Sequence, residues 1–545
     1  MLADGLIGGL GNGGGFLFQT LVKRLGLLDS RLELGSKRPA LFPLLARCGA
    51  EQLFAFTDDR SELAQGLLAT YMFYCFHKTF PFVNSVNSLL PRYLVFATTT
   101  GAFAHRSPFR LQFGMGSPIM PFMIMHRYLN QIRFCAIGVP LLFSLAGVAL
   151  AAPDDWPQFR GPNRDDISPD TGLLKELPAG GPPLAWKATG LGAGYSTVSV
   201  VGNRIYTIGE SGDSSVVIAL NAADGKQVWT AKLGKSGAPG MPAFEGPRST
   251  PAVEGDLLVA VGQWGDLICL EIASGKELWR KDYIKDFGGK CPNWGFSESP
   301  LIDGNNVVIT PGGAEGAIVA LDKKTGAVVW RSKDFTEAPH YSSIIIAQIG
   351  GVRQYIQLTA QSVVGVAAAD GKVLWRAVRA GRTAVIPTPI YSDGFVYVTS
   401  SYGTGCNLFK ITVAEGKFTA EEVYANKVMA NHHGGVIKVG DCVYGYSEGK
   451  GWVCQDFKTG ESKWEEKEKL GKGSILCADG HFYLRTEDKG TIAFIDASPA
   501  GYQEHGRFEQ PDRSKNKAWP HPVICGGKLY LRDQDALLCY DVKAK

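Results

Sequence analysis

Residues 267–279 read Leu-Ile-Cys-Leu-Glu-Ile-Ala-Ser-Gly-Lys-Glu-Leu-Trp. An alternating apolar run ends at a Ser-Gly turn, and an indole follows that glycine by four residues. Apolar alternation is typical of a half-buried strand, and glycine supplies the positive φ that a tight turn needs. The stretch therefore predicts a β-hairpin whose second strand carries a tryptophan.

The same pattern recurs along the chain, with the glycine always four residues before the tryptophan: Gly225 and Trp229, Gly326 and Trp330, Gly371 and Trp375, Gly460 and Trp464. A further copy keeps the glycine, Gly416, but has Ala420 in place of the indole. A second set of glycines lies upstream, in strands that start with Ser-Pro or Ser-x-Pro in their clearest copies: Gly202, Gly255, Gly304, Gly351, Gly394, Gly440, Gly480 and Gly527. Repetition at roughly 40–50 residues, with strands and turns in each unit, is typical of a propeller.

The sequence therefore predicts an all-β fold, an eight-bladed β-propeller. A β-sandwich with accidental similarity is the alternative, and the two sets of glycines, which keep step, favour the propeller. The last unit, at residues 537–541, lacks the strand with the indole, and residues 184–186 (Leu-Ala-Trp) supply one near the other end. We expect the N- and C-terminal strands to pair and close the ring, which leaves no open edge.

These motifs resemble the PQQ-like (quinoprotein-type) β-propeller repeat over residues 182–545. The family includes quinoprotein alcohol dehydrogenases and an outer-membrane assembly lipoprotein that uses the blades as a scaffold. The dehydrogenase branch implies a PQQ cofactor with calcium and oxidation of an alcohol or sugar. Against that branch, no two cysteines are adjacent, no CxxCH haem motif is present, and only Glu298 with neighbouring asparagines could serve calcium.

The first part of the chain fits no repeat. From Met125 a basic segment precedes an apolar run at residues 134–150, and Ala149-Leu150-Ala151 is a small-x-small cleavage site. This pattern predicts a signal peptide at residues 125–151, and hence an exported, periplasmic or extracellular protein. Residues 1–124 are then a non-native or disordered extension ahead of a mis-assigned start. The alternative is a genuine extension with an internal anchor.

Residues 152–181 form an N-terminal segment that contains Trp-Pro-Gln-Phe-Arg-Gly-Pro-Asn-Arg. The segment resembles the start of many exported bacterial PQQ-like propellers. Two prolines exclude a regular strand, whereas the aromatic side chains need burial. We expect the segment to pack across one end or side of the ring as a structural anchor, with ligand binding as the alternative.

Composition limits the possible partners. A net charge of +4 over 545 residues, without a Lys/Arg cluster, argues against nucleic acid. The apolar run at residues 134–150 is too short for a stable membrane span. We expect the protein to be a monomer. Cysteines 269, 454 and 539 share one repeat position, which favours small buried hydrophobes over disulfides. No CxxC motif or His/Cys cluster is present, so no metal site is expected.

In a propeller the innermost strands surround the axis, and the loops before them rim a funnel where ligands bind. The aligned loops supply candidate cofactor-binding residues and two candidate bases, Glu298 and His433. Arginine and lysine could hold carboxylates and tryptophan could stack on a flat ring. The binding candidates are Arg248, Trp294, His340, Tyr341, Arg382, His432, Lys472, Trp519 and His521.

A structural interpretation of these residues, in which they satisfy backbone groups around a narrow channel, remains open. Successive residues of a strand point to opposite faces, so only one of His432 and His433 is expected to face the axis. The sequence predicts ligand or partner binding at the funnel, with PQQ-dependent oxidation as the alternative. A hydrolase is a third possibility, and no spaced carboxylate pair supports it.

Overall fold

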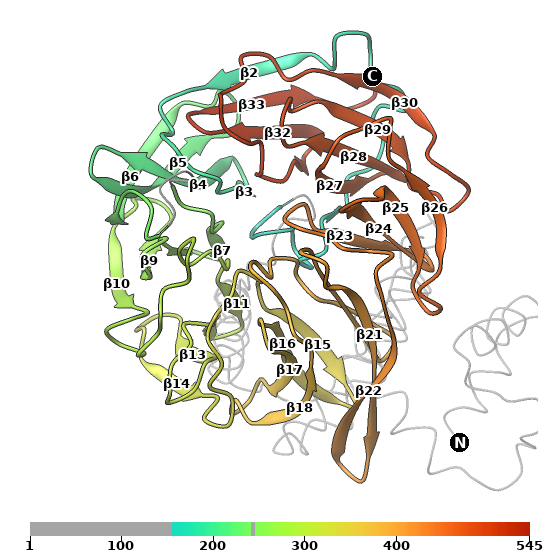
Figure 1. Cartoon of the computed structure of the whole chain (residues 1–545). Helices are drawn as coiled ribbons and strands as arrows, with labels where there is room; N and C mark the ends of the chain where they lie inside the picture. Colours follow the sequence, from blue (N-terminus) through green and yellow to red (C-terminus); the bar gives the residue numbers. More distant parts are fainter. Residues whose placement is uncertain (1–154, 241–245) are drawn as a thin grey trace, which may run out of the picture. The chain divides into compact units, whose positions relative to one another are not determined.

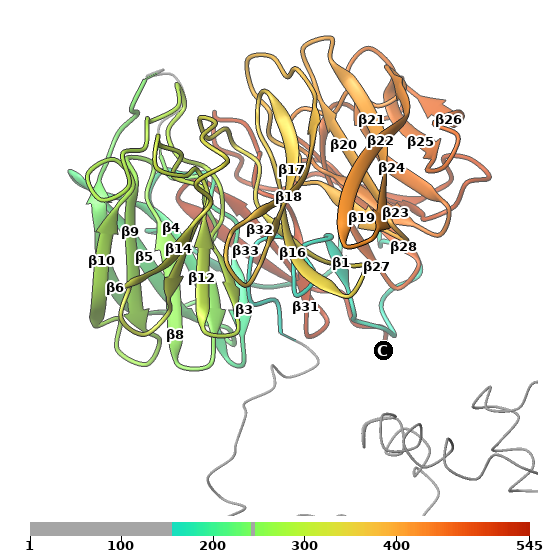
Figure 2. The same ribbon diagram turned by 90° about the horizontal axis from the view of Figure 1, so that it is seen from below.

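A computed structural model describes residues 155–240 and 246–545. Their strands form eight sheets, seven with four strands and one with five, arranged radially around an axis (Figure 1). The predicted eight-bladed, all-β propeller is confirmed. Viewed from the side, the strands of several blades run roughly along the ring axis (Figure 2). The proposed extension and signal peptide, residues 1–151, lie outside the described residues.

Blades 1 to 4 follow one another along the chain, and within each the strands pair antiparallel from the innermost to the outermost. Their strands are β3 (Ser199–Val201), β4 (Arg204–Ser211), β5 (Ser214–Asn221) and β6 (Gln227–Lys235); β7 (Ala252–Glu254), β8 (Leu257–Val261), β9 (Asp266–Glu271) and β10 (Glu277–Asp282); β11 (Leu301–Asp303), β12 (Asn306–Ile309), β13 (Val319–Asp322) and β14 (Val328–Arg331); and β15 (Ile345–Ile349), β16 (Val352–Leu358), β17 (Ser362–Ala367) and β18 (Val373–Val378).

Blades 5 to 8 continue the same order around the ring. Their strands are β19 (Ile390–Ser392), β20 (Phe395–Ser400), β21 (Gly405–Ala414) and β22 (Lys417–Asn426); β23 (Val436–Val439), β24 (Cys442–Ser447), β25 (Gly451–Asp456) and β26 (Ser462–Glu466); β27 (Gly473–Ala478), β28 (His481–Thr486), β29 (Ile492–Asp496) and β30 (Glu504–Phe508); and β31 (Val523–Cys525), β32 (Lys528–Asp533) and β33 (Ala536–Asp541), completed by β2 (Leu184–Ala188).

Blade 8 closes the ring as the sequence predicts. Strand β2 is its outermost strand and pairs antiparallel with β33, with Trp186 opposite Cys539. The first and last parts of the propeller thus share one sheet, in which every strand has the partner that the repeat requires.

The repeated glycine and tryptophan belong to neighbouring blades and contact each other. A Cβ atom on Gly275 would lie 2.6 Å from the indole of Trp229 in the preceding blade, and Gly275 itself has φ +72°. The Trp229 indole N–H donates to the backbone oxygen of Ile272 in the same turn, at 3.0 Å. Glycine is therefore required twice over, for the backbone conformation and for the close approach of the indole.

Blade 5 departs from this arrangement. Its hairpin β21–β22 is longer, with ten residues in each strand, so Ala420 does not occupy the indole position. Tyr424 does, opposite Leu408, and its hydroxyl donates to the Phe457 oxygen of blade 6 at 3.0 Å. A Cβ atom on Gly416 would have no neighbouring atom within 4 Å. The indole N–H of Trp375, in blade 4, instead donates to the Gln354 side chain of its own blade. The junction between blades 4 and 5 consequently lacks the indole–glycine contact.

The N-terminal segment crosses the ring axis and bonds to the inner parts of several blades (Figure 1, teal segment). Trp156 pairs with Val200 of blade 1, and strand β1 (Ile167–Ser168) runs parallel to β27 of blade 7. The Arg164 guanidinium donates to the backbone oxygens of Ile344, at 2.7 Å, and of Ser299, at 3.0 Å. Burial lowers the pKa of Arg164 to about 9. These contacts tie the segment to blades 1, 3, 4 and 7.

Apolar side chains fill the spaces between neighbouring blades, and the eight cysteines of the described residues are all free thiols. Cys269, Cys454 and Cys539 are fully buried in the third strands of their blades, as expected. Within residues 155–240 and 246–545, no helix has the length and apolar character needed to cross a membrane.

Candidate functional site

A cavity of about 210 Å³ lies at the centre of the ring, where the loops before the innermost strands converge. Its wall is mostly apolar and aromatic. The six aromatic residues of the wall are Phe159, Tyr195, Trp294, Tyr341, Tyr402 and Trp519, and three histidines join them, His432, His433 and His521. A cavity with this lining suits a small organic molecule with a flat face.

The structure brings seven of the predicted residues together at this cavity: Arg248, Trp294, Tyr341, His432, His433, Trp519 and His521. They come from blades 2, 3, 4, 6 and 8, far apart in sequence. The repeat alignment could collect them because each lies just before the first strand of its blade.

Four predicted residues are not among those that line the cavity. Glu298 is buried and accepts hydrogen bonds from the Tyr283 hydroxyl, at 2.9 Å, and from the Thr310 amide, at 2.5 Å. Burial raises the pKa of Glu298 to about 7, although these bonds oppose the shift. His340 accepts a hydrogen bond from the Val385 amide, and Arg382 is exposed. Lys472 reaches the cavity only through His432.

Both His432 and His433 line the cavity, so the prediction that only one of them faces the axis is wrong. The prediction assumed that the pair lies on a strand. Residues 431–435 instead form a loop before β23, where the backbone does not alternate its side chains between two faces.

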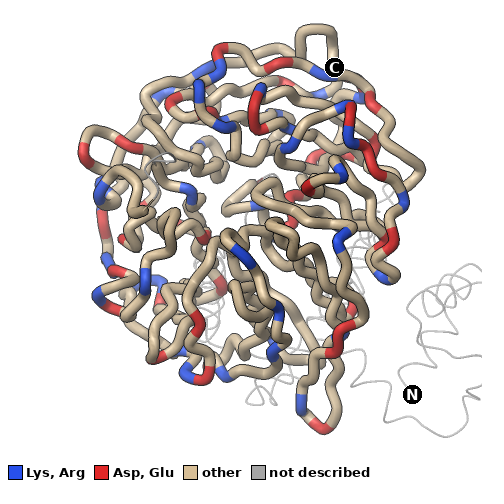
Figure 3. Tube along the Cα trace, in the orientation of Figure 1, with Lys and Arg blue, Asp and Glu red and all other residues tan. Residues whose placement is uncertain are grey.

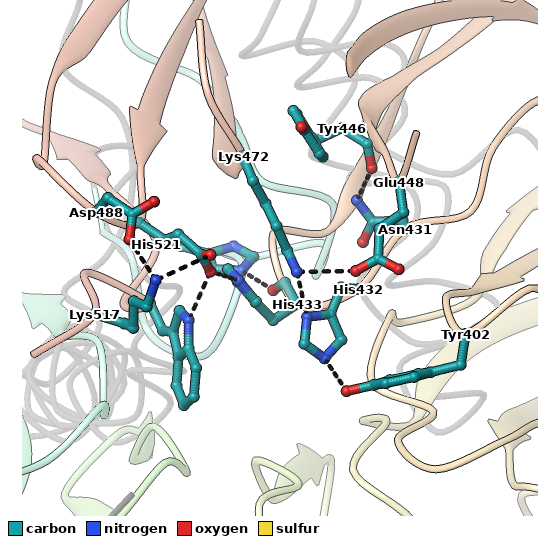
Figure 4. Close-up of polar contacts among 12 residues, drawn as sticks. Tyr402, Asn431, His432, His433, Tyr446, Glu448, Lys472, Asp488, Lys517 and His521 are labelled. Carbon is teal, nitrogen blue, oxygen red and sulfur yellow. Dashed lines mark hydrogen bonds and ion pairs between the residues drawn. The ribbon is translucent and has the colours of Figure 1, made fainter. Parts of the chain in front are cut away.

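His433 is held in one orientation by Glu487 and is one of the residues that line the cavity; Figure 4 shows it beside His432. The Nε2 atom of His433 lies 2.5 Å from Glu487 Oε2, and the indole N–H of Trp519 donates to the same oxygen at 3.0 Å. Burial acts to raise the pKa of Glu487, but the bonds from His433 and Trp519 and the charge of Lys472 outweigh it and hold the pKa at about 2.

These contacts fix the tautomer of His433. Burial lowers the pKa of His433, so the ring is neutral near pH 7, and an ionised Glu487 can only accept a proton from Nε2. The proton therefore sits on Nε2, and Nδ1 carries a lone pair. Nδ1 is buried and has no hydrogen-bond partner among the described residues. His433 thus lines the cavity, and its Nδ1 is an acceptor that none of the described residues uses.

His432 belongs to a second chain of polar contacts (Figure 4). The Lys472 ammonium donates to His432 Nδ1 at 2.7 Å and to Glu448 Oε1 at 3.0 Å. The Tyr402 hydroxyl lies 3.0 Å from His432 Nε2. Burial lowers the pKa of His432 to about 3, with His433 and Lys472 adding to the effect. Since Lys472 donates to Nδ1, the neutral ring carries its proton on Nε2 and donates to Tyr402.

Sequence reasoning missed Tyr402, Glu448 and Glu487. Each follows the second strand of its blade, after β20, β24 and β28 respectively. In a propeller the turn after the second strand and the loop before the first strand meet at the same end of the blade. Polar residues just after the second apolar run of each repeat were the signal that could have found them.

Arg248 supplies positive charge to the opposite side of the cavity wall. Its guanidinium lies 5.3 Å from the centre of the Tyr195 ring and donates to the Gly246 oxygen at 3.0 Å. Burial lowers its pKa. The Tyr195 and Trp519 rings are in contact, at 4.7 Å between centroids. Elsewhere Lys and Arg are interspersed with Asp and Glu around the ring (Figure 3).

The donor set does not fit a calcium ion. Ca²⁺ takes six to eight oxygen ligands, usually including carboxylates. No aspartate or glutamate is among the residues that line the cavity, and the nearby Glu487 and Glu448 bond to His433 and Lys472. A flat organic anion fits better, because Arg248 and the aromatic wall can hold it without a metal.

Comparison with known proteins agrees with this architecture. The PQQ_2 family model, described as outer membrane protein assembly factor BamB, matches residues 212–466. The BamB of Xanthomonas campestris pv. campestris is 26% identical over 216 residues, which are 38% of this chain and 48% of that protein. Quinohemoprotein alcohol dehydrogenase ADH IIB of Pseudomonas putida is 28% identical over 148 residues, 24% of this chain and 20% of the enzyme.

The chain thus spans about half the length, or less, of these curated relatives. Among solved structures, the quinohemoprotein alcohol dehydrogenase of Comamonas testosteroni has a TM-score of 0.51 at 14% sequence identity. The superposition covers 73% of this chain and 82% of the enzyme's chain. That likeness concerns the fold. Repeat motifs, blade number and family match together identify the chain as a member of the PQQ-like β-propeller repeat family.

Proposed function

We propose that the central cavity binds a small organic ligand that has a flat face and a hydrogen-bond donor. The observation that carries the proposal is His433, whose Nδ1 is an oriented acceptor without a partner among the described residues. Trp519, Trp294 and Tyr341 offer aromatic faces to a ring, and Arg248 offers a cation to an anionic substituent. A hydroxylated ring has this chemistry, and so does a flat carboxylate that also carries an N–H or O–H donor.

Two probes test the proposal, glucose as a hydroxylated ring and PQQ as a flat tricarboxylate. Isothermal titration and quenching of tryptophan fluorescence would measure their binding to the wild type and to His433→Ala. Loss of a hydrogen bond reduces the free energy of binding by about 1 kcal/mol or more. Whichever probe binds the wild type should therefore bind His433→Ala roughly 5- to 10-fold more weakly. Its melting temperature should fall only modestly, because the variant removes the bond from His433 to Glu487.

His340→Ala is the matched control, since His340 is a half-buried histidine of blade 4 outside the cavity lining. We expect it to bind the probe as tightly as the wild type does. Failure of both probes to bind, or equal binding by His433→Ala, would contradict the proposal. A large loss of stability in His433→Ala would make that residue structural.

Quinone-dependent oxidation is a second candidate, supported by the similarity to quinohemoprotein alcohol dehydrogenase ADH IIB. A bound quinone would supply the electron acceptor. This chain's own contribution would be His433 Nδ1, the acceptor that would take the hydroxyl proton of an alcohol. Because the donor set does not fit calcium, dye-linked alcohol oxidation with PQQ should not depend on added Ca²⁺. PQQ binding without turnover would favour a binding role.

Partner binding is the remaining alternative, supported by relatives described as outer membrane protein assembly factors. A propeller can present its loops to another protein, and the long connection between β10 and β11 suits that use. We also propose that residues 125–151 direct export, which would place this binding outside the cytoplasm.

A further inference from the structure

Two histidines and an aspartate meet on blade 7, away from the central cavity. His481 begins β28 and pairs directly across the sheet with Asp496, which ends β29, while His505 lies on the neighbouring strand β30. His505 Nε2 lies 2.8 Å and His481 Nε2 lies 3.6 Å from the same oxygen, Asp496 Oδ1. The three ligand atoms all lie within 4.8 Å of one another.

The tautomer of His481 leaves a lone pair aimed at this aspartate. His481 Nδ1 lies 2.9 Å from the backbone oxygen of Asp479, which can only accept, so Nδ1 carries a proton. In the neutral ring Nε2 is then an acceptor, and it faces the carboxylate of Asp496, another acceptor. A cation between the two groups satisfies both. A histidine that donates its other N–H to a backbone oxygen is the usual arrangement at metal sites.

Blade 7, like blade 5, lacks the indole that the outer strands of the other six blades carry. Ile495 pairs with Glu504 and Ala493 with Arg507, which leaves His505 and Gly506 opposite Phe494. In blade 6 the corresponding register places Trp464 opposite Cys454. His505 thus lies on the outer strand close to the position where the repeat otherwise places a tryptophan. A bound ion would join β28, β29 and β30.

We propose that His481, Asp496 and His505 bind a divalent transition-metal ion, Zn²⁺ in the first instance. Two imidazole nitrogens and a carboxylate oxygen are ligands that Zn²⁺ accepts, and a water molecule would complete four-coordination. Ligand atoms around a tetrahedral Zn²⁺ ion lie about 3.3 Å apart. Side-chain rotations that move each ligand atom by about 1 Å bring the three atoms to that spacing. The three side chains are 15%, 32% and 25% exposed, which leaves an ion a path from solvent.

The absence of CxxC motifs and His/Cys clusters led to the expectation of no metal site. The three residues are well separated in sequence and approach one another only when three strands align. The prediction from sequence had no means of recognising them.

Calorimetric titration of the full chain with ZnCl₂ tests the site, with protein purified without a polyhistidine tag and treated with a chelator. We expect one equivalent to bind to the wild type. His505→Ala and Asp496→Asn should each weaken binding at least tenfold, and Zn²⁺ should raise the melting temperature of the wild type but not of these variants. Cobalt substitution should give the intense visible absorption of a tetrahedral ion.

His433→Ala is the control, because the histidines that line the cavity are the other place among the described residues where imidazole nitrogens gather and could bind zinc. We expect it to bind Zn²⁺ as the wild type does. Absence of a saturable equivalent would overturn the proposal. Binding that survives His505→Ala and Asp496→Asn but is lost in His433→Ala would place zinc in the cavity and overturn it equally. A folded near-ultraviolet circular dichroism spectrum of each variant makes these outcomes decisive.

Discussion

At His433 a single neighbouring carboxylate determines what the side chain can do. An imidazole can accept at either nitrogen, and Glu487 occupies Nε2, so that only Nδ1 remains for a ligand. His432 carries its proton on the same atom, Nε2, which donates to Tyr402, but Lys472 occupies its Nδ1. Two adjacent histidines of the same type thus differ in their available atoms because their partners differ.

The depressed pKa of Glu487 has a consequence for stability. The folded value of about 2 lies below the reference value of 4.5, so the carboxylate stabilises the folded state above about pH 4.5. This contribution is lost as the pH falls toward 2. We expect the difference in free energy of unfolding between the wild type and Glu487→Gln to be largest near pH 6 and to shrink toward pH 3.

Urea unfolding at a series of pH values measures that difference. Glu315→Gln is the control, since the Glu315 side chain is 82% exposed in its ion pair with Arg331. Its difference from the wild type should be small throughout. A difference for Glu487→Gln that does not change with pH would contradict the prediction.

At the scale of the element, a contact between an indole and the glycine of the next blade joins blade 8 to blade 1, blade 1 to blade 2, blade 2 to blade 3 and blade 3 to blade 4. The indole of Trp330 packs on Gly371, whereas Gly416 at the equivalent turn of blade 5 has no such neighbour. Apolar side chains of blades 4 and 5, including the buried Trp375 and Phe409, pack in one cluster at that junction instead.

Gly371→Ala and Gly416→Ala separate the two roles of the repeated glycine. Both residues have positive φ, +74° and +73°, so each alanine pays a similar backbone cost of about 1 kcal/mol. Only at Gly371 would the Cβ lie 2.3 Å from the Trp330 ring. We expect Gly371→Ala to lower the free energy of unfolding by about 1–3 kcal/mol more than Gly416→Ala does.

Equilibrium unfolding followed by tryptophan fluorescence measures both variants. Equal losses would mean that the glycine serves only the turn, and that the indole has room to move aside.

At the scale of the whole molecule, two parts of the chain from the N-terminal side hold the ring together. Strand β2 completes blade 8, and the segment from Trp156 to β1 bonds across the axis to the inner parts of several blades. Arg164 is central to the second, because its buried guanidinium bonds backbone oxygens of blades 3 and 4.

Arg164→Met should therefore destabilise the entire propeller. The substitution leaves buried backbone oxygens without donors, and we expect a loss of about 3–5 kcal/mol, because removal of one partner leaves the others buried and unsatisfied. Arg353→Met is the control, since Arg353 is 50% exposed in its pair with Asp303 and should cost about 1 kcal/mol or less. Chemical denaturation checks both, and similar losses for the two would contradict a special role for Arg164.

The local pattern was sufficient to predict the fold. Alternation and the paired glycine and tryptophan depend only on near neighbours in sequence. The strand missing from the last of eight copies, and present ahead of the first, indicated a closed ring. The same alignment placed Arg248, Trp294, Tyr341, His432, His433, Trp519 and His521 at the cavity, since equivalent positions of the modules face one axis. Glu298 shares that alignment but points into the protein, because Tyr283 and Thr310 bond it there.

The sequence by itself determined the all-β class, the number of blades and the closure of the last blade by β2, because each follows from a periodic pattern. Only the tertiary structure decided which atoms are available at the cavity and on blade 7. The partners of His433 and His505 are Glu487 and Asp496, which no spacing rule connects to them. Hydrogen bonds and burial set the protonation of a side chain, and both depend on strands from different parts of the chain meeting in space.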